Sequence, residues 1–205
     1  MYPHYLPKVF LITPQYPPLG LPMAEFSFRI ADALADDFSV TVVAPNLEWK
    51  EVNGISLKGF VNPVYDHQNV VTWAFSASKE VERIIASEIY EKKSPGSLVV
   101  INWELTPGVL SLARFFSLPI YFIPFSFEVQ RASGLSSILS LAIEEIEKSA
   151  VAASTLTILF DDALLKYYLS YGGPKEKVTV LRSSLLSEKP VLVKKFADLF
   201  DNKTG

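Results

Sequence analysis

Three neighbouring residues, Asn102, Trp103 and Glu104, directly follow the apolar run 98–101 and carry side chains suited to a polyhydroxylated ligand. The face of an indole ring can stack on a sugar ring, and a carboxylate accepts hydrogen bonds from hydroxyl groups. We therefore interpret Trp103 and Glu104 as candidate binding residues. In the alternative interpretation, Trp103 packs at the edge of the core and Glu104 contacts the cap of the next helix. We expect Asn102 chiefly to hold the loop backbone in place.

Two other loops that follow apolar runs supply further candidates. Tyr16 and Gly20 belong to the Pro- and Gly-rich segment 14–22, and Ser126 comes shortly after the apolar run 120–123. Glycine lets the backbone approach a ligand closely, but one glycine alone is a weak sign of a phosphate site. We expect Gly20 to be a turn residue with a positive φ. Tyr16 is expected either to pack or to line the same cleft.

No group of residues predicts a metal centre or a bound cofactor. The chain has no cysteine, which excludes disulfides and thiolate sites, and its two histidines, His4 and His67, stand far apart in irregular sequence. The adjacent carboxylates Asp161 and Asp162 precede a predicted helix, where capping is the expected role of an aspartate. Catalytic residues are therefore left unassigned.

The elements that carry these loops read as alternating strands and helices. The runs 8–13 and 39–44 are continuously apolar, as is typical of parallel strands covered on both faces, and an amphipathic helix from Pro22 supplies the crossover between them. This order predicts an α/β fold with a doubly wound, mostly parallel sheet and helices on both faces. Ligands of such folds bind at the carboxyl ends of the strands, which is where the candidate residues fall.

The rest of the chain continues the alternation. Asn53-Gly54 predicts a turn before a short strand, and the stretch 61–77 shows no regular pattern. The charged residues of a helix at 135–153 are interpreted as its solvent-exposed face; they are Glu144, Glu145, Glu147 and Lys148. Further strands are predicted at 98–101, 120–123, 155–160 and 177–181, and further helices around 81–89, at 106–116 with Thr106 as N-cap, from Asp161 or Asp162 to Gly172, and at about 190–201.

Length, charge and composition bound the classes of function. Without a linker or a shift in composition, residues 1–205 are expected to form a single α/β domain. The formal net charge of −3 and the lack of a basic run argue against nucleic acid and against an acidic membrane surface as partners. The start of the chain lacks the features of a signal peptide, so a cytoplasmic location is expected. The apolar region 98–127 is too interrupted for a membrane span.

Several segments together resemble the starch and glycogen synthases and their relatives among the retaining glycosyltransferases. The segments 8–14, 16–20, 24–26 and 39–45 are similar to the opening strand, turn, helix and second strand of that family. The segment 99–106 looks like the strand and loop where the family usually has His-Asp-Trp-His-Thr, and 118–123 and 155–160 resemble its next two strands. The likeness covers about residues 8–184 and implies the Rossmann-like half of a two-domain GT-B fold.

The resemblance also implies a function. In the family, the amino-terminal domain binds the growing α-glucan acceptor, and a carboxyl-terminal domain binds ADP-glucose or UDP-glucose. The chain is therefore expected to bind an α-glucan or maltooligosaccharide and to associate with a donor-binding domain or with itself; no donor-binding domain is expected within its 205 residues. The implied acceptor-binding residues are Tyr16, Gly20, Asn102, Trp103, Glu104 and Ser126.

Three departures from the family pattern bear on activity. Leu19-Gly20-Leu21-Pro22, with one glycine and no lysine, stands where the family has a glycine-rich turn. Phe125 or Ser126 stands where it has a cleft histidine, and Arg182-Ser183-Ser184 where it has an Asn-Gly turn. Proline lacks an amide donor, and a phenylalanine ring has no hydrogen-bonding group for a sugar hydroxyl. We therefore expect the chain alone not to transfer glucose.

Two alternative functions stay open on the sequence. The chain could be a non-catalytic glucan-binding or subunit-interaction protein of the same fold, which the lost histidine and glycines favour. A mean hydropathy of +0.25 also fits a surface that a partner covers. The chain could instead be a nucleotide-binding Rossmann protein, but the Gly-x-Gly-x-x-Gly fingerprint is missing.

Overall fold

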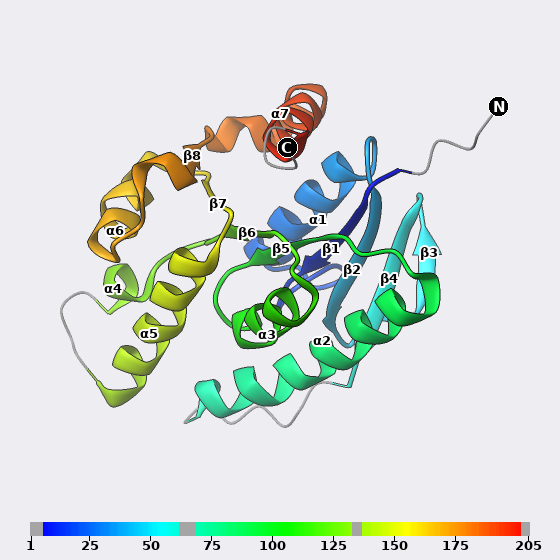
Figure 1. Ribbon diagram of the computed structural model, residues 1–205. Coiled ribbons are helices and arrows are strands. Elements are labelled where there is room, and N and C mark those ends of the chain that lie inside the picture. The colour runs from blue at the N-terminus through cyan, green and yellow to red at the C-terminus, as the bar shows by residue number, and fades with distance from the viewer. Residues whose placement is uncertain (1–5, 62–68, 133–136, 202–205) are drawn as a thin grey trace.

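The computed structural model describes residues 6–61, 69–132 and 137–201, and every strand in these ranges belongs to one sheet (Figure 1). The strands are β1 (Lys8–Ile12), β2 (Ser39–Pro45), β3 (Lys50–Val52), β4 (Ile55–Phe60), β5 (Ser97–Ile101), β6 (Ile120–Ile123), β7 (Leu156–Leu159) and β8 (Val178–Val180). They lie in the order β3-β4-β2-β1-β5-β6-β7-β8, and all neighbouring pairs are parallel except β3 with β4. The predicted doubly wound, mostly parallel sheet is confirmed.

Helices cover both faces of this sheet. They are α1 (Pro22–Leu34), α2 (Val70–Lys92), α3 (Thr106–Phe116), α4 (Glu128–Arg131), α5 (Ile138–Ala153), α6 (Leu165–Ser170) and α7 (Lys189–Asp201), with three short 3-10 helices, η1 (Asp162–Leu164), η2 (Lys175–Lys177) and η3 (Ser183–Ser187). One core lies between the sheet and α2, α3 and α5, and a second core lies between the sheet and α1 and α7 (Figure 1).

Successive strand residues alternate between these two cores. Phe10 and Ile12 of β1 belong to the core on the α2 and α3 side, whereas Val9 and Leu11 belong to the core on the α1 side. All four side chains are buried, since both faces of the strand are covered. This explains why the run is continuously apolar in sequence although successive side chains point in opposite directions.

The order of the connections places a topological switch point beside β1. From β1 the chain passes to β2 and then to β3 and β4 at one edge, before α2 returns it to β5 on the other side of β1. The loops after β1 and β5 therefore lead to helices on opposite faces of the sheet, and the carboxyl ends of these two strands form the switch point. Doubly wound folds bind their ligands at this position.

α7 covers a part of the sheet that the crossover helices leave open. α3 and α5 both pack on the opposite face, so the side chains of β6 and β7 that point toward the α1 face need another cover. Phe196 and Phe200 of α7 are buried there, and the ring of Phe200 stacks on that of Tyr121 at a centroid distance of 3.9 Å. Lys189 pairs with Asp32 of α1 (Nζ to Oδ2, 3.1 Å), which links α7 to α1 at its other end.

α2 begins earlier than the sequence pattern predicts. The pattern indicates no regular structure before about residue 77, yet the helix starts at Val70. The Asn69 side chain caps its first turn by accepting a hydrogen bond from the amide of Thr72 (3.2 Å). Trp73 and Ala74 then pack into the core. The buried face of this first part of α2 consists of small and aromatic residues, whereas aliphatic residues form it further along the helix. The helical periodicity is therefore harder to recognise in the sequence here.

The predicted N-cap is wrong for α3 and correct for η1. Leu105 is the N-cap of α3, whereas Thr106, the predicted cap, is the first helical residue and donates its hydroxyl hydrogen to the carbonyl oxygen of Asn102 (3.2 Å). Asp161 caps η1 as predicted, because its Oδ1 accepts a hydrogen bond from the amide of Ala163 (2.8 Å).

Some predicted features lie outside the described residues. These are the two histidines, His4 and His67, and the predicted start of a helix at 135. Among the described residues, α5 begins at Ile138 after the cap Ser137, and none of the helices combines the length and the apolar character needed to cross a membrane.

Candidate functional site

Loops at the carboxyl ends of β1, β5 and β6 meet at the switch point. Asn102, the first residue after β5, links two of them. Its backbone amide donates to the carbonyl oxygen of Ile123 (2.9 Å), and its side-chain Oδ1 accepts a hydrogen bond from the backbone amide of Phe125 (3.3 Å). The loop after β1 leads into α1, where the ring of Phe26 contacts that of Phe125 edge-on at a centroid distance of 5.6 Å. The structure thus brings together elements that lie about a hundred residues apart in the chain.

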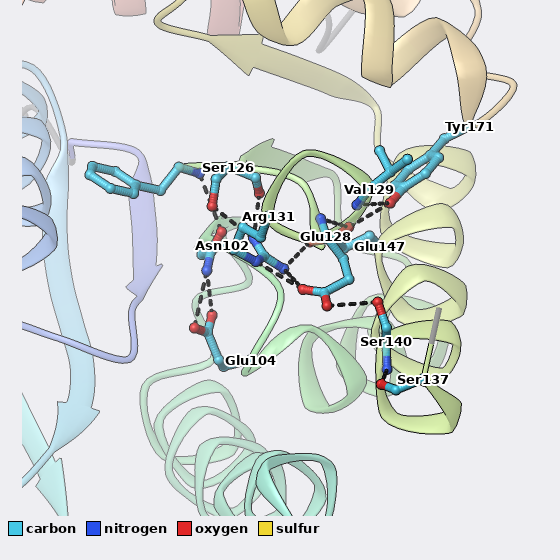
Figure 2. A network of polar contacts seen from close by, with 11 residues as sticks. Asn102, Glu104, Ser126, Glu128, Val129, Arg131, Ser137, Ser140, Glu147 and Tyr171 are labelled. Atoms are coloured by element: carbon cyan, nitrogen blue, oxygen red, sulfur yellow. Dashed lines mark hydrogen bonds and ion pairs between the residues drawn. The ribbon is translucent and has the colours of Figure 1, made fainter. Parts of the chain in front are cut away.

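Asn102 has a left-handed backbone conformation with a φ of 60°. Asparagine tolerates this region better than most residues. Its Nδ2 donates to both carboxylate oxygens of Glu104, at 3.0 and 2.8 Å (Figure 2). Asn102 therefore holds the loop backbone, as the sequence predicts, and it also orients the Glu104 side chain.

The environment of Glu104 favours its neutral form. Burial raises the pKa of the Glu104 carboxyl group from 4.5 to about 7, although hydrogen bonds from its own amide and from Asn102 favour the charged form. The residue nevertheless stays partly exposed. Near neutral pH the carboxyl group is present in both protonation states, so it can either donate a hydrogen bond to a ligand hydroxyl or accept one from it.

We expect Glu104 to make the protein less stable as the pH rises from about 4.5 to about 7. The folded state holds the proton more tightly than the unfolded chain, so this contribution is complete below the unfolded pKa and is lost as the pH passes the folded pKa. Its size is on the order of 3 kcal/mol at most. Urea denaturation at about pH 5 and about pH 8 measures it, and Glu104→Gln should remove the part of the difference that Glu104 contributes. An unchanged pH dependence in that variant would contradict the raised pKa.

Figure 2 shows Arg131 of α4 at the centre of a polar network that links the loop after β6 to α5. Its Nη1 donates to the backbone oxygen and to Oγ of Ser126 (3.1 and 2.7 Å), and its Nη2 pairs with Glu128 and with Glu147 of α5 (2.8 and 2.9 Å). Glu147 is 0% exposed and also accepts hydrogen bonds from the Tyr171 hydroxyl (2.9 Å) and the Glu128 amide (2.7 Å). The network therefore holds Ser126 and positions the loop after β6.

The sequence pattern does not indicate this network, and the solvent-exposed position predicted for Glu147 is wrong. The spacing carried a signal: Glu147 stands four residues after Ile143 and four before Val151, and both of these are buried. The apolar stripe of α5 thus passes through Glu147. A buried carboxylate needs a partner, but the partner, Arg131, lies on a four-residue helix that the pattern does not predict.

The remaining predicted site residues to be placed are Trp103, Tyr16 and Gly20. Trp103 is buried in the core on the α2 and α3 side, so we assign it no stacking on a sugar. Tyr16 is also buried, and its ring contacts that of Phe28 edge-on. Gly20 is exposed, and the positive φ predicted for it is wrong. The chain reverses just before it, over two prolines, with the amide of Leu19 donating to the Tyr16 carbonyl oxygen (3.3 Å), so no glycine is required there.

Comparison with known proteins relates the chain to others through its fold. No protein-family model matches the sequence, and no curated protein matches it. Sucrose-phosphate synthase from Thermosynechococcus elongatus aligns with a TM-score of 0.67 at 11% identity, over 86% of this chain and 48% of the synthase. UDP-N-acetylglucosamine 2-epimerase from Rickettsia bellii aligns with a TM-score of 0.59 at 11% identity, over 95% of this chain and 48% of the epimerase.

A second structure of the same synthase holds a shorter chain. It aligns with a TM-score of 0.64 at 11% identity, over 94% of this chain and 99% of the other. The chain thus spans about half the length of the two longer proteins and almost all of the shorter one. The chain therefore has a Rossmann-like α/β fold with a mostly parallel sheet, as in the matching half of these GT-B neighbours.

Proposed function

We propose that this chain binds a saccharide acceptor, an α-glucan or maltooligosaccharide, where the loops after β1, β5 and β6 meet, which is the position of the ligand crevice in doubly wound folds. The observation that carries the proposal is the partly exposed carboxyl group of Glu104 at the topological switch point, oriented there by Asn102. Structural neighbours that are named for sugar chemistry support a carbohydrate as the ligand.

Three side chains at this crevice can bind a sugar in complementary ways. The carboxyl group of Glu104 can donate a hydrogen bond to a sugar hydroxyl group or accept one from it. Phe125 is 40% exposed and its ring contacts that of Phe26, so it offers an apolar face on which a pyranose can stack. The buried Trp103 cannot take this role. The Oγ of Ser126 accepts a hydrogen bond from Arg131, which leaves its hydroxyl hydrogen free to be donated to the ligand.

We infer that the chain alone does not transfer glucose. It spans about half of the longer structural neighbours, so a donor site on the other half of a GT-B fold would have to come from another domain or chain. The apolar Phe125 also stands at or beside the position where the resemblance places a histidine. Binding without turnover is therefore the expected behaviour of the isolated chain.

A non-catalytic role in subunit interaction is the second candidate. The observation that favours it is a set of exposed apolar side chains on the α2, α3 and α5 side of the molecule, among them Phe75, Phe115 and Leu141. A hollow of about 520 Å³ between these helices is lined mainly by apolar residues. Apolar surface gathered on one side is typical of an interaction site.

Titration of the isotope-labelled chain with maltoheptaose tests the first proposal. We expect changes in the amide chemical shifts of 102–104 and 125–126 at millimolar sugar, and roughly tenfold weaker binding in Glu104→Gln, which loses the carboxylate acceptor. Glu145→Gln, a substitution on the exposed face of α5, serves as the matched control and should bind normally. An absence of shift changes would contradict the binding proposal. Glucose transfer from UDP-glucose or ADP-glucose by the chain alone would contradict the second inference.

A further inference from the structure

A cavity of about 420 Å³ lies at the carboxyl ends of β7 and β8, away from Glu104. Its lining consists of the two short segments 160–162 and 181–184. Phe160 and Leu181 are buried and form the apolar part of the lining. The cavity falls within the range of about 300–1,000 Å³ that small-ligand sites occupy.

The polar side chains of this cavity make few bonds within the protein. Asp161 accepts a hydrogen bond from the amide of Ala163. For the side chains of Asp162, Arg182 and both serines of 183–184, the structure shows no hydrogen bond or ion pair with any other described residue. A guanidinium group, two hydroxyl groups and a carboxylate are thus available in one place for a ligand.

The chemistry of the lining favours a neutral, hydroxyl-rich ligand over an anion. Two carboxylates, Asp161 and Asp162, accompany the single guanidinium of Arg182, so the local charge does not favour a phosphate. Carboxylates accept hydrogen bonds from vicinal hydroxyl groups, whereas Arg182 and the serine hydroxyls donate to hydroxyl and ring oxygens.

Aromatic contacts connect this cavity with the crevice at Glu104. The ring of Phe160 contacts that of Phe26 edge-on at a centroid distance of 5.3 Å, and Phe26 contacts the exposed Phe125 at 5.6 Å. Both the cavity and the crevice lie at the carboxyl edge of the sheet, to which β5, β6, β7 and β8 contribute in order. One extended ligand can therefore reach both places along the same edge.

We propose that the cavity at 160–162 and 181–184 is a second saccharide subsite, which binds a sugar unit of the same glucan at a distance from Glu104. The inference rests on the proposed function for the identity of the ligand, and it adds a specific role for Asp162 and Arg182. Because two subsites hold a long glucan and only one holds a short one, affinity increases with chain length.

Amide chemical-shift titrations with maltose and maltoheptaose test the subsite. We expect maltoheptaose to shift the amides of 183–184 as well as those near Glu104, and Arg182→Ala or Asp162→Asn to weaken its binding by roughly fivefold to tenfold. Both side chains are exposed and without protein partners among the described residues, so the fold should be kept. Lys175→Ala, exposed on the nearby η2 and outside the cavity lining, is the control and should leave binding unchanged.

The outcomes separate the two proposals. Shifts near Glu104 with none at 183–184, and normal affinity in both cavity variants, would overturn the second subsite and leave the proposed function standing. Shifts at 183–184 with none near Glu104 would support a saccharide site in the cavity and contradict the proposed crevice. The absence of shifts in both places would overturn both.

Discussion

Replacing Glu147 with alanine is expected to lower the free energy of unfolding by about 3–5 kcal/mol. The carboxylate is fully buried and accepts hydrogen bonds from the Arg131 guanidinium, the Tyr171 hydroxyl and the Glu128 amide. Without it, the hydroxyl and the amide lose an acceptor that water cannot easily replace, and Arg131 keeps Glu128 as its remaining ion-pair partner. Equilibrium urea denaturation followed by circular dichroism gives the difference.

Glu145 on the same helix provides the matched control. Its side chain is 73% exposed and pairs with Lys148 at the surface. Glu145→Ala is therefore expected to change the free energy of unfolding by less than about 1 kcal/mol. Similar losses in the two variants would show that the cost comes from the helix rather than from the buried network.

The same network should transmit the loss of Glu147 to the candidate site. Arg131 holds Ser126 through two hydrogen bonds and is itself held by Glu147. In Glu147→Gln, which keeps the shape of the side chain and loses its charge, we expect changed amide shifts at Ser126 and weaker maltoheptaose binding. Unchanged shifts at Ser126 would contradict a positioning role for the network.

Replacing Phe200 with alanine is expected to lower the free energy of unfolding by about 3–5 kcal/mol. The ring is 4% exposed and stacks on Tyr121, and it also contacts the rings of Phe38 and Phe196. The change removes the central side chain that α7 places against the sheet. A thermal or urea unfolding curve measures the loss, and size-exclusion chromatography shows whether the uncovered face of β6 makes the chain associate.

Tyr121 and Val191 supply the controls for this prediction. The buried Tyr121 hydroxyl has no hydrogen-bond partner among the described residues, so Tyr121→Phe keeps the stack and should leave stability equal or higher. Val191 of α7 is 42% exposed, and Val191→Ala should cost less than about 1 kcal/mol. If Phe200→Ala left both stability and association state unchanged, α7 would not be part of the core.

Local sequence patterns are sufficient to predict the architecture and the edge of the sheet that carries the candidate site. Apolar runs such as 9–12 and 98–101 are buried on both faces, as expected of a parallel sheet covered by helices, and helical periodicity between them indicates the crossovers. Asn102 and Glu104 could be placed at the carboxyl edge because they directly follow such a run. These inferences succeed since they depend on local periodicity, which the chain carries in a few neighbouring residues.

Which side chains lie exposed at the candidate site and which are buried depends on packing between elements. Trp103 and Phe125 both follow strands, yet Trp103 turns into the core and Phe125 stays exposed, because the helices packed against each loop differ. Glu147 is buried since Arg131 and Tyr171, from other elements, meet it there. Partners of this kind are brought together by packing between distant segments, and no local pattern in the chain specifies them.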